Sequence, residues 1–191
     1  MFPKRSPLLR RLFGMAVASI VFQGLSPDTA WGQATFGNQE ATVLLKGLSY
    51  DRNTAARSGA GGILLIYQGP NKADADKAAA ILSAAGPDGP VKVSVSSFTS
   101  VAELMASLDR APQSAIFVHA SAAPAIASIV QVSRARKIPS LAHSADMVEK
   151  GIAIGVKGNA DTARLTVNLR AAKTEGIDLP AAVLSSAVVI P

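Results

Sequence analysis

The sequence predicts an α/β protein: one domain with a mainly parallel sheet, helices on both faces, and a β-hairpin and helix at its C-terminal end. Aliphatic runs such as ILLIY (63–67) and SAIFVHA (114–120) are typical of strands buried on both faces. These runs alternate with segments of helical periodicity, the order that produces a covered parallel sheet. From Gly151 onward, two segments of period two flank the turn-rich tetrad GNAD, which indicates a hairpin.

The elements of the first half follow from hydrophobic period and turn residues. Residues 39–57 carry an apolar helical stripe that ends before SGAGG, and the strand 63–67 follows. Residues 72–85 place apolar side chains at the spacing of one helix face, and Gly86 ends that helix. Residues 91–98 alternate between apolar and polar, as a strand does.

The second half continues the same alternation. Ser100 and Glu103 have the spacing of a capping box, which predicts a helix that begins after Ser100. A further helix is expected from Pro124, which a first helical turn tolerates, to about Arg136. The segment 139–144, PSLAHS, is a short strand in this interpretation.

The first 34 residues have the pattern of a cleaved secretory signal peptide. The first eleven residues contain four basic side chains and no acid, and residues 12–22 form an apolar run too short to span a bilayer. Small residues allow cleavage after Gly32 or after Ala34. The alternative is a buried amphipathic helix, but the basic flank favours export. The mature domain is then 35–191, and we expect it to be periplasmic.

The composition of the mature chain limits its function. Removal of the leader lowers the formal net charge from +6 to about +3, and few aromatic residues remain to stack on bases, so nucleic-acid binding is disfavoured. The absence of cysteine excludes disulfides and a lipoprotein anchor. There is no second long apolar stretch, so we expect a soluble protein that is not embedded in the membrane.

The glycines do not form a phosphate-binding loop. No Gly-Lys-Ser/Thr step occurs in the chain, and a dinucleotide fingerprint needs glycines that follow a strand and open a helix. Gly155 lies within a strand pattern, Gly158 lies between two strands, and GAGG (59–62) precedes its strand. Turn chemistry explains all three observations better.

The chain is poorly supplied for metal binding or nucleophilic catalysis. It has two histidines, no cysteine, no HExxH motif and no GxSxG elbow. His119 with Ser121, and His143 with Ser144 and Asp146, do contain the residue types of a catalytic triad. Polar strand exits and helix caps explain these residues more simply. We therefore expect no catalytic residue, no metal and no cofactor.

A binding crevice is the better interpretation of the same residues. Both clusters follow strand ends, where open α/β sheets place their ligand sites. The candidate ligand-binding residues are His119, Ser121, His143 and Ser144. The wider carboxyl edge would add Gln68, Ser96 and Ser97.

The segment from Pro139 to Pro191 resembles the YfiR/HmsC-like family of small periplasmic proteins. The matching features are PSLAHSADMVEKGIAIGV, then a turn, then ARLTVNLRAAKTEGIDLPAAVLSSAVVI. In that family a hairpin ends in an Asn-containing step, here Val167-Asn168-Leu169. An Ala-rich helix start, a Gly and a hydrophobic C-terminal helix and tail then follow. The match covers about a third of the mature chain, and its motifs are structural.

The resemblance implies a non-enzymatic periplasmic regulator. Characterised relatives repress an inner-membrane diguanylate cyclase through its periplasmic sensor domain, which lowers cyclic-di-GMP output and biofilm formation. The expected partner is therefore the periplasmic domain of an inner-membrane signalling protein, a diguanylate cyclase or a sensor kinase. The chain departs from the family in two respects. Its first helix reads LLKGLSYDRN where relatives have an aromatic-rich helix, and it lacks the cysteines that some relatives carry.

Candidate contact residues for such a partner are Leu48, Tyr50 and Arg52 on the first helix, because Tyr and Arg are enriched at interface hot spots. The competing interpretation is that these side chains simply cover the sheet. The alternative function is a periplasmic solute-binding protein for a small ligand, although such proteins usually have two lobes and a longer chain. A hydrolase is the third hypothesis. Whether the protein forms a homodimer stays open.

Overall fold

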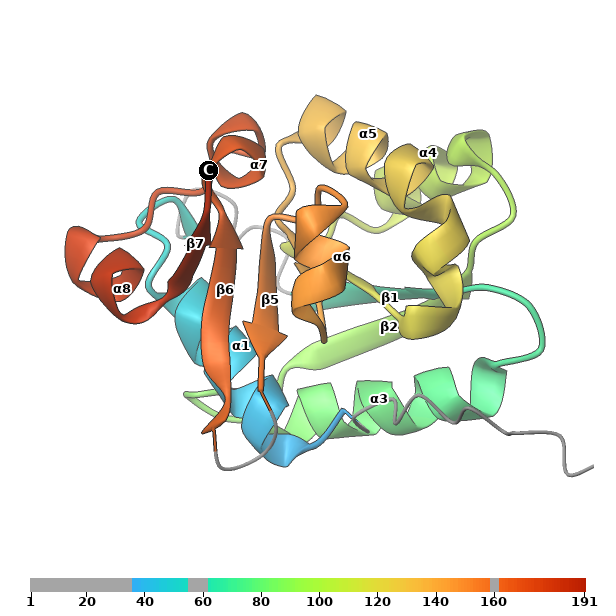
Figure 1. The fold of residues 1–191 in the computed structure, drawn as a ribbon. Coiled ribbons are helices and arrows are strands. Elements are labelled where there is room, and N and C mark those ends of the chain that lie inside the picture. The colour runs from blue at the N-terminus through green and yellow to red at the C-terminus, as the bar shows by residue number, and fades with distance from the viewer. Residues whose placement is uncertain (1–35, 55–61, 159–161) are drawn as a thin grey trace, which may run out of the picture. The chain divides into compact units, whose positions relative to one another are not determined.

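The computed structural model describes residues 36–54, 62–158 and 162–191, all within one compact unit, Ala34–Pro191. The predicted signal peptide, residues 1–34, lies outside these ranges and stays a prediction. The described chain forms a seven-stranded sheet in the order β2-β1-β3-β4-β5-β6-β7. Figure 1 shows β1 beside β2, and β5, β6 and β7 next to one another. The strands are β1 Gly62–Tyr67, β2 Lys92–Ser97, β3 Ala115–Val118, β4 Ser140–Ala142, β5 Ile154–Lys157, β6 Arg164–Asn168 and β7 Val188–Ile190.

The sheet is parallel except at one pair. Strands β5 and β6 are antiparallel, with Ile154 opposite Val167 and Lys157 opposite Arg164, and every other neighbouring pair is parallel. The helices are α1 Asn38–Ser49, α3 Lys72–Ala84, α4 Val101–Arg110, α5 Ile126–Arg136, α6 Ala145–Glu149, α7 Leu169–Thr174 and α8 Ala181–Ser186, and a 3₁₀ segment η2 spans Ala120–Ala125. The predicted fold class is confirmed.

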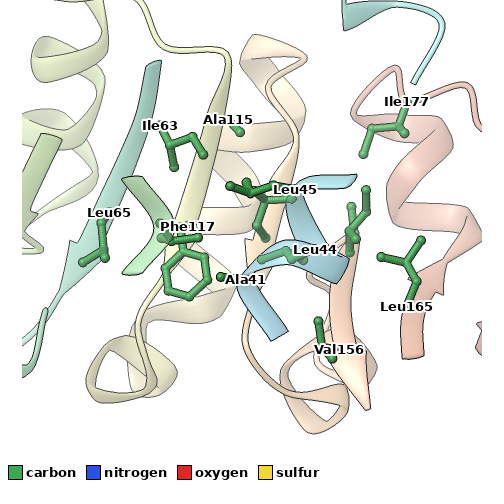
Figure 2. Packing of buried hydrophobic residues seen from close by; sticks show 14 of the residues in the cluster. Ala41, Leu44, Leu45, Ile63, Leu65, Ala115, Phe117, Val156, Leu165 and Ile177 are labelled. Carbon is green, nitrogen blue, oxygen red and sulfur yellow. The ribbon is translucent and has the colours of Figure 1, made fainter. Parts of the chain in front are cut away.

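Two hydrophobic clusters cover the two faces of the sheet. One packs α1 and α3 against the sheet around Phe117, which is fully buried (Figure 2). The other packs α4, α5 and α6 against the opposite face, around Ile116 and Val118. Successive residues of a strand point to opposite faces, so Phe117 belongs to the first cluster, whereas its neighbours Ile116 and Val118 belong to the second. This arrangement explains why the strand reads as a continuous aliphatic run.

The first helix is shorter than the sequence pattern predicts. The predicted helix 39–57 ends at Ser49, and its positions 55–57 lie outside the described residues. The side chain of Asp51 accepts hydrogen bonds from the backbone N–H groups of Asn53 at 3.1 Å and of Asp178 at 2.8 Å. The backbone N–H of Arg52 donates to the carbonyl of Asp178 at 3.0 Å. These contacts replace the helical hydrogen bonds and attach the end of α1 to the segment before α8.

The capping box at α4 is only half formed. The hydroxyl of Ser100 accepts a hydrogen bond from the backbone N–H of Glu103 at 3.1 Å, as predicted. The Glu103 carboxylate instead accepts a hydrogen bond from the hydroxyl of Thr99. The Thr99 hydroxyl therefore replaces the backbone N–H of Ser100 as the hydrogen-bond donor to the Glu103 carboxylate. Pro124 also lies in the 3₁₀ segment η2 and not in the first turn of α5.

The predicted hairpin is confirmed by β5 and β6, although residues 159–161 of its loop lie outside the described residues. Gly158 has a φ of 105°, a left-handed conformation that glycine adopts without the strain of a side chain. The C-terminal tail forms β7 and pairs in parallel with β6, whereas the sequence predicted only a helix and tail.

Candidate functional site

The two candidate histidines lie next to each other at the carboxyl edge of the sheet. Val118, the last residue of β3, is in register with Ala142, the last residue of β4, and His119 and His143 directly follow them. Phe117 and Leu141, two residues earlier, belong to the cluster on the α1 and α3 face. The alternation of side chains therefore directs both imidazole rings toward that face of the sheet.

A hydrogen-bond network joins β1, β3 and η2 around His119. The backbone N–H of His119 donates to the carbonyl of Ile66 at 2.9 Å. The Nδ1 atom of His119 lies 2.9 Å from the hydroxyl of Ser121 and accepts the Ser121 backbone N–H at 3.2 Å. The Ser121 hydroxyl accepts a further hydrogen bond from the backbone N–H of Gln68 at 3.1 Å. Three predicted residues of the carboxyl edge therefore form one network.

This network assigns the tautomer of His119. Because Nδ1 accepts a backbone N–H, the neutral ring carries its proton on Nε2. The Nε2–H group has no hydrogen-bond partner among the described residues. The ring can therefore donate one hydrogen bond to a bound molecule from a fixed orientation.

Burial favours the neutral form of both imidazoles, because it lowers the pKa of each. Removal from water lowers the pKa of His119, and the charge of Asp74 on α3 partly opposes this effect. Burial also lowers the pKa of His143, the nearby His119 lowers it further, and Asp146 acts in the opposite direction. The electrostatic effect of one ring on the other agrees with their neighbouring positions in the sheet.

An aromatic residue that the sequence interpretation missed covers His143. The ring of Phe36 lies 6.4 Å from the imidazole of His143 in an edge-to-face arrangement and 5.1 Å from the ring of Phe117. Phe36 precedes α1, so this helix start is attached directly to the candidate site. A lone apolar residue two positions before a helix is a weak signal, and only the fold places it here.

The remaining predicted residues of the carboxyl edge, Ser144, Ser96 and Ser97, lie outside this hydrogen-bond network. Ser144 occupies the N-cap position of α6, where its side chain makes no capping hydrogen bond. Ser96 and Ser97 end β2, an outer strand of the sheet, whereas the histidines follow β3 and β4 near its middle. The structure therefore brings His119, Ser121 and His143 together and leaves Ser96 and Ser97 outside the network.

The hydrogen bonds of His119 and Ser121 differ from those of a catalytic triad. The Ser121 hydroxyl and His119 have the distance of a nucleophile and its base, but Nδ1 is already taken by the backbone N–H of Ser121. No carboxylate of the described ranges hydrogen-bonds to His119 to orient it as a triad requires. Across the same ranges, no group of three or more metal-ligating side chains occurs. An Nε2–H donor with Asp74 nearby can instead contact a small polar ligand.

The three candidate partner-contact residues have different environments. Leu48 is partly buried and packs against the core, which agrees with the interpretation that it covers the sheet. Tyr50 is 45% exposed. Arg52 is exposed and forms a 3.6 Å ion pair with Asp178. Of the three, Tyr50 and Arg52 are exposed and Leu48 is of intermediate exposure.

The fold is similar to that of several solved structures, each less than 20% identical in sequence to this chain. An ABC domain in complex with L-Trp from Streptococcus pneumoniae matches with a TM-score of 0.56 and 19% identity, over 79% of this chain and 60% of that one. A ligand-free, open substrate-binding protein with adhesive properties from Clostridium difficile matches with a TM-score of 0.56 and 17% identity, over 76% and 58%. A conserved domain protein from Vibrio cholerae matches with a TM-score of 0.54 and 18% identity, over 68% and 54%.

These likenesses establish the α/β fold, and the chain spans a little more than half the length of each of these proteins. No protein-family model and no curated protein matches the sequence. Within the described ranges, no helix has the length and apolar character that crossing a bilayer requires.

Proposed function

We propose that this chain is a non-enzymatic periplasmic regulator that binds the periplasmic sensor domain of an inner-membrane signalling protein and represses it. The observation that carries the proposal is the structure of the segment that resembles the YfiR/HmsC-like proteins. The hairpin β5–β6 leads through Asn168 into α7, in the order that the resemblance implies. The Asn168 side chain accepts the backbone N–H of Ala171 at 2.9 Å and donates to the carbonyl of Val148 at 3.1 Å.

The role of Asn168 gives that resemblance a physical basis. Its side chain caps α7 and at the same time attaches the end of β6 to α6. An asparagine at this step therefore serves the fold, and a shared asparagine supports a shared fold. The regulatory role rests on the resemblance itself. The leader-like first 34 residues support export to the compartment where such a partner is found.

A second candidate is a periplasmic solute-binding protein for a small ligand, and the comparisons favour it. Two of the structural neighbours are described by what they bind: one is in complex with L-Trp, and the other is a substrate-binding protein. The free Nε2–H of His119 at the carboxyl edge is a suitable group for contact with a ligand. Both candidates are binding functions, and they differ in whether the bound species is a protein domain or a small molecule.

The regulator is tested by deletion of the gene in the source bacterium and measurement of intracellular cyclic-di-GMP. We expect the level to rise, and expression of the full chain to restore it, because loss of a repressor releases the cyclase. A version without residues 1–34 stays in the cytoplasm and should fail to restore repression. If neither cyclic-di-GMP nor the output of an adjacent sensor kinase changes on deletion, the regulatory role is wrong.

The solute-binding candidate is tested with the exported protein purified from the periplasmic fraction. A ligand at about 100 times its Kd stabilises the folded state by about 2.7 kcal/mol, which thermal unfolding detects readily. A panel of amino acids and other small polar metabolites serves as the probe. A compound that stabilises the wild type and the Ser96→Ala control, but not His119→Ala, would favour solute binding. A panel without such a compound favours the regulator.

A further inference from the structure

Three large apolar side chains are exposed on the described residues: Tyr50, Leu169 and Val189, with exposed fractions of 45%, 39% and 39%. They come from three separate elements, the end of α1, the start of α7 and the strand β7. Single exposed apolar residues are ordinary on a protein surface, but several in one place indicate an interaction site.

A groove of about 280 Å³ lies between α7 and α8. Leu169 lines the groove. Val189 is the register partner of Val167, which also lines it, so the two side chains point to the same face of the sheet. Arg52, which follows α1, pairs with the groove residue Asp178 at 3.6 Å, so the chain just after α1 adjoins the groove. Leu169 and, on the same face of the sheet as Val167, the side chain of Val189 therefore form an exposed apolar surface at this groove.

The strand β7 adds an unpaired edge to this patch. It is the last strand of the sheet and pairs with β6 alone among the described strands. An edge strand presents backbone N–H and C=O groups that can pair with a second chain, and partner recognition commonly uses such edges. We call this surface, formed by the groove and the exposed side chains of Leu169 and Val189, the α7–α8 surface.

The rim of the α7–α8 surface is basic. Arg170 and Lys173 are exposed on α7, three residues apart and so on one face of the helix, and neither forms an ion pair within the described part of the chain. Lys137, which follows α5, donates from its ammonium group to the carbonyl of Thr174 at the end of α7, at 2.7 Å. The acidic residue of the groove, Asp178, is already paired with Arg52. The rim therefore attracts negative charge.

We propose that the α7–α8 surface binds a segment of the partner protein that carries apolar anchor residues flanked by Asp and Glu. This proposal rests on the proposed regulatory function and names the surface that performs it. A second copy of this chain fits less well, because a two-fold interface places the same patch on both sides. Such an interface would bring Arg170 and Lys173 of the two copies together, and like charges across an interface oppose binding.

The test uses the full chain in the source bacterium, with a photo-crosslinking amino acid, p-benzoylphenylalanine, in place of Leu169. The same amino acid at Ala80, which is exposed on α3, is the matched control. We expect a crosslink from position 169 and none from position 80. Mass spectrometry of the crosslinked peptide should identify a segment of another protein in which Asp and Glu outnumber Lys and Arg.

Charge reversal separates this surface from general electrostatic attraction. Each lost charge contact of about 1 kcal/mol lowers affinity about five-fold, so Arg170→Glu with Lys173→Glu should lower the crosslink yield by at least about that factor. Lys92→Glu with Arg110→Glu makes the same change in net charge at exposed positions on β2 and α4 and should leave the yield unchanged. All of these positions are exposed, so thermal unfolding should show that each variant folds.

Several outcomes would overturn the proposal: no crosslink at position 169, a crosslink to a second copy of this chain, a peptide without an acidic excess, or equal loss in both charge-reversal variants. The proposed function is assessed separately. If gene deletion raises cyclic-di-GMP while the variants of Arg170 and Lys173 repress normally, the regulator stands and this surface is wrong. If deletion has no effect on signalling, the function itself fails.

Discussion

The carboxylate of Glu175 accepts hydrogen bonds from the backbone N–H and the hydroxyl of Ser140, at 2.7 and 2.8 Å. Both residues are fully buried. The Ser140 hydroxyl in turn accepts the backbone N–H of Ala153 at 2.9 Å. One side chain in β4 therefore joins the segment that follows α7 to the residue before β5, and it helps to hold a buried carboxylate.

Replacement of Ser140 by Ala should destabilise the fold strongly. It removes a hydrogen bond to a buried carboxylate and leaves the N–H of Ala153 without this acceptor, at a cost of about 2 to 3 kcal/mol. The free energy of unfolding in urea measures the effect. Ser133 provides the matched control, because its hydroxyl is equally buried but has no hydrogen-bond partner. Ser133→Ala should change stability by less than about 0.5 kcal/mol. Equal losses in the two variants would contradict this role of Ser140.

The fold was predictable where local patterns determine structure. The aliphatic runs 63–67 and 114–120 became β1 and β3, because a strand buried on both faces requires continuous apolar residues. The end of α1 at Ser49 was not predictable, because it depends on hydrogen bonds between Asp51 and Asp178, which lie far apart in the sequence. The strand β7 has three residues, and its pairing with β6 arises only in the folded chain.

Gly155→Ala should destabilise the hairpin. A methyl group at Gly155 would overlap the side chain of Val148 on α6 and come within 3.0 Å of the carbonyl of Ser144. Such overpacking costs about 1 to 3 kcal/mol, measured by urea unfolding. Val148→Ala removes the atoms that overlap, so the double variant should lose less stability than the sum of the two single variants. Strict additivity would show that the overlap with Val148 is not the cause.

Asn168→Ala should weaken the connection between β6 and α7. The variant loses the cap on the Ala171 N–H and the hydrogen bond to the Val148 carbonyl, and loss of a helix cap alone costs about 1 kcal/mol. Asn168→Asp keeps an oxygen that can cap the helix but removes the amide donor, so its stability should fall between those of the wild type and Asn168→Ala. Thermal unfolding measures all three proteins. If Asn168→Asp is as unstable as Asn168→Ala, the cap contributes little.

The candidate site was predictable in part. His119, Ser121 and His143 were selected as strand-exit residues, and the parallel order of β3 and β4 brings the two histidines to adjacent positions. Phe36 could not be selected, because its contact with His143 depends on how α1 packs over the sheet. The ion pair that engages Arg52 depends likewise on the docking of the α1 end against Asp178.

The two histidines should make stability depend on pH in the mildly acidic range. Burial lowers the pKa of both imidazoles in the folded state, so the unfolded chain binds protons more readily. The contribution of the two histidines to the free energy of unfolding is therefore fully present above the unfolded pKa of about 6.5. It is lost as the pH drops below that value toward the lower folded pKa. The free energy of unfolding measured between pH 7.5 and 5.5 should decrease. The variant His119→Gln with His143→Gln cannot take up these protons, so its decrease should be smaller than that of the wild type. An identical decrease in both proteins would assign the pH dependence to other groups.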